Sequence, residues 1–71
     1  MAVEVRAQIT GTVWKVLARV GDRVAEEQAI AILESMKMEI PVEAPSAGQI
    51  QAVHVAEGDV IEEGALLFTL A

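Results

Sequence analysis

Apolar and polar residues alternate along this chain in short runs with a period close to two. This period is typical of half-buried β-strands and not of amphipathic helices, whose apolar residues recur every three to four positions. One segment, 25–33, is rich in Ala and Glu and could also form a helix. The pattern as a whole predicts about eight short strands, the clearest of which cover residues 3–5, 30–33, 38–42 and 66–70.

An internal repeat relates the two halves of the chain. Residues 5–33 align with residues 42–70 at a constant shift of 37 positions. The counterpart of Glu27 in the second half is Gly64, and glycine is unfavourable inside a helix, so the repeat also favours a strand over a helix at 25–33. Two related halves imply a pseudo-two-fold symmetric fold. The identical pairs are Val5/Val42, Ala7/Ala44, Gly11/Gly48, Val16/Val53, Gly21/Gly58, Asp22/Asp59, Glu26/Glu63 and Leu33/Leu70.

Irregular spacing at matching places predicts a β-bulge in each half. The apolar residues Val13 and Val16 are three positions apart, and the second half repeats this step. An odd step breaks strict alternation, so we expect bulges at Trp14-Lys15 and Gln51-Ala52. Trp14 then lies on the outer face of a sheet, where it either contacts a partner or, as we expect, is partly buried under a neighbouring loop. His54 takes an outward position on its strand.

These elements predict an all-β fold, in which two small antiparallel sheets pack face to face or close into a flattened barrel. The repeated Gly-Asp pairs at Gly21 and Gly58 are expected turns. We interpret residues 1–71 as a single domain, because the length allows one small core. The halves 5–33 and 42–70 are joined by a hairpin over residues 34–41.

Composition and charge exclude several classes of function. The net charge of −6 argues against nucleic acid and anionic membrane surfaces as partners, since both attract basic patches. No apolar run approaches the roughly 18 residues of a membrane span, and no secretory signal pattern is visible. The chain has no cysteine. We therefore expect a cytoplasmic protein without a thiolate metal site, and His54 lacks further ligands at metal-binding spacing.

The central hairpin carries the candidate site. Lys37 is the only lysine in the second half of the chain, and it lies at a polar tip between two apolar strands. Its neighbours Met36 and Met38 are unusual there and suggest contacts with another protein. A two-residue loop normally requires Asn-Gly or a similar pair, because both residues need positive φ. Met36-Lys37 therefore forms either a tight turn retained for function or a wider loop. The remaining hairpin residues, which we interpret as solvated context and not as catalytic groups, are Glu34, Ser35 and Glu39.

The sequence 34–39, Glu-Ser-Met-Lys-Met-Glu, resembles the attachment motif of biotin carboxyl carrier proteins and biotin-dependent carboxylases. The likeness continues through the Ala-Pro-x-x-Gly at 44–48 and the paired Gly-Asp turns. From Gly11 to Pro41 the chain looks most similar to the small free-standing biotin/lipoyl attachment proteins. The resemblance implies a flattened barrel of two four-stranded sheets, with Lys37 at an exposed turn and both termini at the other end.

The resemblance also implies a function for Lys37. A biotin protein ligase would attach biotin to its amine, and the arm would carry a carboxyl group from a biotin carboxylase to a carboxyltransferase. Met36 and Met38 would serve in ligase recognition. The chain would then be a monomeric carrier without catalytic residues of its own. A lipoyl carrier for acyl transfer is the alternative, and an unmodified interaction module is a third possibility.

Three features depart from the family pattern. Ser35 stands where the carboxylase motif usually has Ala. Glu27 stands where relatives usually have Gly, and it would be strained if that position requires positive φ. The segment 7–11 lacks the usual Pro, and the chain is too short for the protruding loop of some bacterial acetyl-CoA carboxylase carriers.

Overall fold

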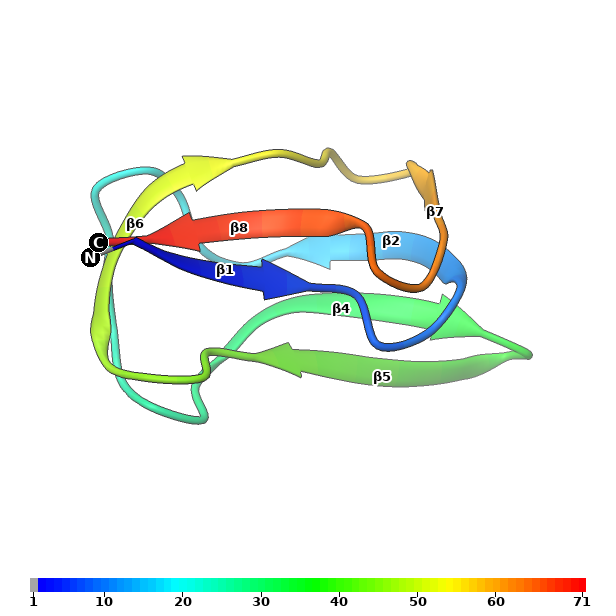
Figure 1. The fold of residues 1–71 in the computed structure, drawn as a ribbon. Helices are drawn as coiled ribbons and strands as arrows, with labels where there is room; N and C mark the ends of the chain where they lie inside the picture. Colours follow the sequence, from blue (N-terminus) through cyan, green and yellow to red (C-terminus); the bar gives the residue numbers. More distant parts are fainter. Residues whose placement is uncertain (1) are drawn as a thin grey trace.

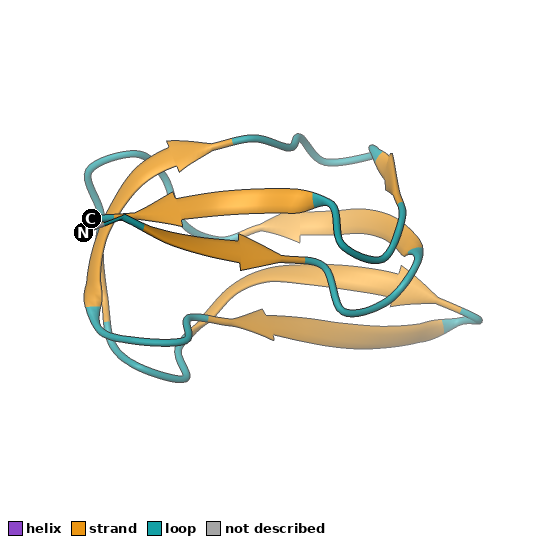
Figure 2. Cartoon of the chain, in the orientation of Figure 1, coloured by secondary structure: helices purple, strands orange, loops and turns teal. Residues whose placement is uncertain are grey.

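The computed structural model describes residues 2–71, which form eight β-strands joined by turns and loops (Figures 1 and 2). No helix occurs in this range, so none is long and apolar enough to span a membrane. The all-β fold predicted from the sequence is confirmed. The strands are β1 (Val3–Arg6), β2 (Gly11–Val16), β3 (Arg23–Val24), β4 (Ala29–Ser35), β5 (Met38–Glu43), β6 (Gly48–Val53), β7 (Val60–Ile61) and β8 (Leu66–Leu70).

The strands form two four-stranded antiparallel sheets, with strand orders β1-β8-β6-β3 and β5-β4-β2-β7. Each sheet takes strands from both halves of the sequence. Exchanging β1 with β5, β2 with β6, β3 with β7 and β4 with β8 converts one sheet order into the other. The pseudo-two-fold symmetry inferred from the repeat therefore holds for the strand topology, and the two halves are interlocked and not side by side.

Equivalent backbone hydrogen bonds occur in the two halves. The Ala7 N–H donates to the Ala65 carbonyl oxygen at 2.8 Å, and the symmetry-related Ala44 N–H donates to the Gln28 carbonyl oxygen at 2.9 Å. Both bonds connect a residue after an edge strand to the turn that precedes a central strand. The repeat thus extends from residue identity to backbone geometry, as expected when the same turns are needed twice.

The inner faces of the two sheets meet in one apolar core. Every buried residue between positions 2 and 71 is apolar, and no buried side-chain nitrogen or oxygen in that range lacks a partner. Alternation along each strand places these side chains between the sheets, where their burial drives folding. The largest side chains with under 2% exposure are Phe68, Ile30, Leu33, Ile50, Leu67, Leu70 and Val13.

Both predicted bulges are present. The register of β2 with β4 shifts between Val13 and Lys15, and that of β6 with β8 shifts between Ile50 and Ala52. The shift lets a three-residue step return the next apolar side chain to the core. Trp14, within the first bulge, lies on the outer face with 43% of its surface exposed. It is thus partly buried on the outer face, as expected from the sequence.

Four β-turns show why glycine recurs in this sequence. The turn Ala56–Asp59 is closed by a bond from the Asp59 N–H to the Ala56 carbonyl, and its third residue, Gly58, has φ of +95°. Turns with positive φ at the third position strongly favour Gly. Three of the four turns follow this rule. The fourth, 25–28, places Glu27 there with φ of 69°, whereas its counterpart Gly64 has φ of 91°. The strain expected at Glu27 is therefore confirmed.

The molecule is elongated, with principal extents of 33 × 17 × 17 Å. Strands β1 and β8 run side by side, so both ends of the described chain lie at one end of the barrel (Figure 1). The β4–β5 hairpin projects at the opposite end. This arrangement places Lys37 far from the termini, as the family resemblance implied.

Candidate functional site: the β4–β5 hairpin

The hairpin closes through a two-residue loop. Ser35 pairs with Met38 as the last cross-strand pair, and the loop residues Met36 and Lys37 have φ of 52° and 66°. Positive φ at both central positions is the signature of a type I′ turn, whose twist matches that of the flanking strands. The tight turn, and not the wider loop, is therefore the correct alternative. Left-handed backbone costs about 1–2 kcal/mol for each residue that carries a Cβ.

Packing beneath the loop holds the hairpin in place. Leu33, which pairs with Ile40 across the hairpin, is 1% exposed and belongs to the core. Gly11, the first residue of β2, lies so close to the hairpin that a Cβ added there would be 2.6 Å from the Glu34 carbonyl oxygen. The absence of a side chain at Gly11 thus allows β2 to support β4 just below the tip.

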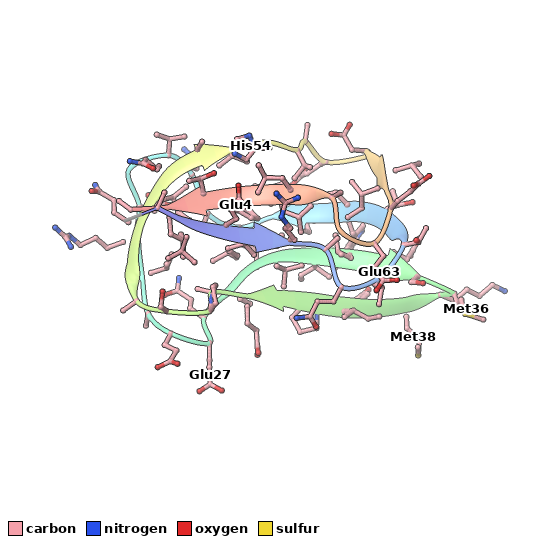
Figure 3. The ribbon with its side chains drawn as sticks, viewed as in Figure 1. Glu4, Glu27, Met36, Met38, His54 and Glu63 are labelled. Atoms are coloured by element: carbon pink, nitrogen blue, oxygen red, sulfur yellow. The ribbon has the colours of Figure 1, made fainter. Side chains whose placement is uncertain are left out.

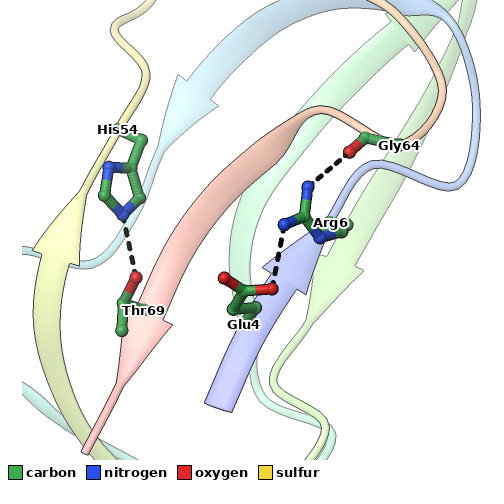
Figure 4. A network of polar contacts seen from close by, with 5 residues as sticks. All are labelled: Glu4, Arg6, His54, Gly64 and Thr69. Carbon is green, nitrogen blue, oxygen red and sulfur yellow. Dashed lines mark hydrogen bonds and ion pairs between the residues drawn. The ribbon is translucent and has the colours of Figure 1, made fainter. Parts of the chain in front are cut away.

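Lys37 is exposed at this tip. Among residues 2–71 it takes part in no hydrogen bond or ion pair, and the one ion pair in that range joins Arg6 to Glu4 at 2.9 Å on β1 (Figure 4). The neighbouring methionines are also exposed, Met36 by 90% and Met38 by 60%, and both side chains lie at the free end of the hairpin (Figure 3). An amine flanked by two accessible apolar side chains is available to another protein.

The carboxylates of the hairpin lie close to each other rather than to the lysine. Glu34 pairs with Glu39 across the strands, and both are exposed. Like charges directly opposite each other repel, which is destabilising unless another protein neutralises them. Ser35 is half-buried at the end of β4, and among residues 2–71 its hydroxyl makes no hydrogen bond with a histidine or carboxylate side chain. The sequence analysis named every residue of this tip. It missed the supporting role of Gly11, although the recurrence of this glycine as Gly48 in the second half was a signal for it.

Outside the hairpin, residues 2–71 contain no cluster of side chains suited to hold a metal ion. His54 is exposed, and its Nε2 lies 2.8 Å from the Thr69 hydroxyl oxygen on β8 (Figure 4). Within the described part of the chain, no group of three or more His, Cys, Asp or Glu side chains could hold a metal ion. The hairpin is therefore the best candidate for a functional site in this molecule.

Comparison with known proteins places the chain in a family. Residues 1–70 match the biotin/lipoyl family model, described as "Biotin-requiring enzyme". The chain is 45% identical over 67 residues to the biotin/lipoyl attachment protein of Bacillus subtilis, covering 94% of this chain and 92% of that protein. It is 46% identical over 65 residues to the biotin carboxyl carrier protein of Streptococcus mutans, covering 92% of this chain and 50% of that protein.

The fold agrees with a solved structure. The chain superimposes on part of the urea carboxylase of Kluyveromyces lactis with a TM-score of 0.94 and 32% identity, covering all of this chain and 6% of that enzyme. The chain thus matches one small part of that enzyme. It belongs to the biotin/lipoyl attachment family, within which it is a carrier domain and not a catalytic domain.

Proposed function

We propose that this chain is a biotin carboxyl carrier whose biotin is attached to Lys37. The observation that carries the proposal is the exposed and unpaired amine of Lys37 at a strained two-residue turn. Strain at a turn that could have been Asn-Gly is retained where function depends on the residues. The family membership and the likeness to biotin carboxyl carrier proteins support biotin as the attached group.

The attachment reaction requires little from this chain beyond access. The Lys37 Nζ would attack the acyl carbon of biotinyl-adenylate, forming an amide bond while AMP leaves and the amine loses a proton. No described base contacts Lys37, so a biotin protein ligase would supply the proton acceptor. Met36 and Met38 offer that ligase an apolar surface on both sides of the amine.

The hairpin would then act as a rigid mount for a mobile arm. Once attached, biotin supplies a ureido nitrogen that takes a carboxyl group at a biotin carboxylase and releases it at a carboxyltransferase. The chain raises the effective concentration of the carried group at both sites. Projection of β4 and β5 beyond the barrel keeps the core fold out of either active site (Figure 1). Biotin carboxylase and carboxyltransferase are thus the expected partners, and we propose a monomeric carrier. Its cytoplasmic location stays a prediction.

The decisive experiment uses the two lysines of the chain. Purified protein incubated with biotin protein ligase, ATP and biotin should gain the mass of one biotinyl group. Lys37→Arg should gain nothing, whereas Lys15→Arg, the matched control at the other lysine, should be modified as fully as the parent. Modification of Lys37→Arg, or no modification of the parent, would refute the proposal.

A lipoyl carrier is the second candidate, because the turn presents its lysine to any ligase and one matching relative is named for both groups. The same protein incubated with lipoate ligase, ATP and lipoate gives the comparison. If lipoylation of Lys37 is faster than biotinylation at equal enzyme concentration, the lipoyl function replaces the biotin function.

A further inference from the structure

The pseudo-two-fold symmetry allows each surface position to be compared with its counterpart in the other half. On and after β2, Trp14, Leu17 and Val20 are apolar and are 43%, 52% and 64% exposed. The counterparts, 37 positions later, are the polar residues Gln51, His54 and Glu57. Three large apolar side chains are therefore exposed on one half of the molecule where the other half exposes polar groups.

At Leu17 the backbone does not require an apolar side chain, because the equivalent backbone hydrogen bond is made in both halves. The Leu17 N–H donates to the Ile30 carbonyl at 2.9 Å, and the His54 N–H donates to the Leu67 carbonyl at 2.9 Å. A polar residue is thus compatible with this backbone. Three exposed apolar side chains within seven positions of the chain, where the other half carries polar ones, indicate an interaction surface.

Basic residues accompany the apolar ones. The Lys15 Nζ lies 5.7 Å from the centre of the Trp14 ring, and Arg19 begins the following turn. Their counterparts are Ala52 and Ala56, so this difference between the halves also involves charge. With Arg23, three of the five basic residues fall within nine positions in a chain of net charge −6.

The acidic groups beside this surface are already engaged by the backbone. The Asp22 Oδ2 accepts a hydrogen bond from the Arg19 N–H at 2.9 Å, and the Glu57 Oε2 accepts one from the Val16 N–H at 3.1 Å. Neither carboxylate forms an ion pair with Lys15 or Arg19 among the described residues. The basic groups are therefore available to the carboxylates of another molecule.

The position of this surface suits a carrier. Lys15 pairs with Ile32 on β4, the strand that leads to the hairpin tip. Ile32 is five residues before Lys37, which corresponds to roughly 15 Å of extended chain. The surface begins beside the hairpin and continues toward the other end of the molecule, so a protein bound there would leave the Lys37 side chain free to reach an active site.

We propose that Trp14, Lys15, Leu17, Arg19 and Val20 form a docking surface for an acidic, partly apolar surface of the biotin carboxylase component. The identity of this partner rests on the proposed function. Trp and Arg are among the residue types that most often dominate the free energy of binding at an interface, and this surface presents one of each, Trp14 and Arg19. The basic residues complement an acidic patch at short range, where screening by salt reduces the effect of the chain's net charge of −6.

The test exchanges residues between the two halves of the fold. An apolar exchange, Trp14→Gln with Leu17→His, and a charge exchange, Lys15→Ala with Arg19→Ala, introduce side chains that the other half already carries at the equivalent positions. Gln51→Ala with His54→Ala on the opposite sheet is the matched control. Biotinylated carriers are assayed as substrates of the purified biotin carboxylase of the same organism.

We expect each exchange to raise the KM for the carrier about tenfold and to leave kcat unchanged, because docking and not chemistry is affected. The control pair should change neither. High salt should raise the KM of the parent and have less effect on the charge exchange. An unchanged KM for the exchanges, or an equal rise for the control pair, would overturn the docking surface.

A second measurement separates docking from biotin attachment. Titration calorimetry of the unmodified Lys37→Arg carrier with biotin carboxylase should show binding that the apolar exchange weakens about tenfold, whether or not Lys37 is ever biotinylated. Biotinylation of the exchange variants by the ligase should proceed at the parent rate. Binding of the parent and of the exchange variants to phosphatidylglycerol vesicles is measured in parallel. If the exchanges slow only the ligase reaction, or if they abolish only the binding to vesicles, the assigned partner is wrong.

Discussion

Replacing Glu27 with glycine should stabilise this protein. Glu27 is the third residue of the turn 25–28 and has φ of 69°, a left-handed conformation that its counterpart in the second half adopts as Gly64. Its side chain is exposed, points away from the barrel (Figure 3) and makes no hydrogen bond or ion pair within residues 2–71. The substitution therefore removes a Cβ from a strained backbone and loses no described side-chain interaction.

The magnitude follows from two opposing terms. Left-handed backbone costs a residue with a Cβ about 1–2 kcal/mol. Glycine gives up about 0.4–1 kcal/mol of this gain, because the unfolded chain becomes more flexible. The bond from the Glu27 N–H to the Ala44 carbonyl, 2.8 Å, matches that from the Gly64 N–H to the Ala7 carbonyl, 2.8 Å, so glycine should retain it. We expect Glu27→Gly to raise the free energy of unfolding by about 0.5–1 kcal/mol.

Urea unfolding followed by the fluorescence of Trp14, the only tryptophan, measures this change. The midpoint should rise at constant slope, and the melting temperature should rise by roughly 3–6 °C. Glu27→Ala is the control, since it removes the carboxylate but keeps the Cβ, and it should gain little. If Glu27→Ala stabilises as much as Glu27→Gly, the strain is electrostatic and the backbone argument is refuted.

Two further predictions concern the hairpin. Replacing Met36-Lys37 with Asn-Gly should raise the free energy of unfolding by about 1 kcal/mol, because Asn-Gly favours the type I′ turn. The same replacement should abolish biotinylation. If urea unfolding shows a less stable variant, the assigned turn is wrong. Gly11→Ala should lower the free energy of unfolding by at least about 1 kcal/mol, because the added Cβ would approach the Glu34 carbonyl oxygen to 2.6 Å. Thr10→Ala is the neighbouring control. Equal losses of unfolding free energy in both variants would contradict the steric reason.

Most of the site could be located from the sequence because its residues are contiguous. Lys37 stands out by its place between the two halves of a repeat and by its flanking methionines, and a hairpin brings these residues together without distant partners. Gly11 could not be assigned its supporting role in this way. Its importance depends on the approach of β2 to the Glu34 carbonyl, a contact between segments more than twenty residues apart.

How much of Trp14 is exposed was also beyond the sequence. Its bulge follows from the three-residue step between Val13 and Val16, but a bulge does not determine which loops cover the outer face. The side chain is 43% exposed because only the inner faces of the two sheets pack against each other. The docking surface thus became visible only when the two halves could be compared position by position in three dimensions.

By itself, the sequence determined the strands, the repeat and the place of the lysine, because alternation and turn residues are local properties of the chain. Tertiary structure decided how the halves combine. Strand β1 of the first half pairs with β8 of the second half, and β5 of the second half likewise pairs with β4 of the first half. It also forced positive φ on Glu27, Met36 and Lys37. The physical reason is that a strand can satisfy its hydrogen bonds with many partners. Burial of one shared core selects among these pairings, and the turns then adopt whatever backbone the selected pairing requires.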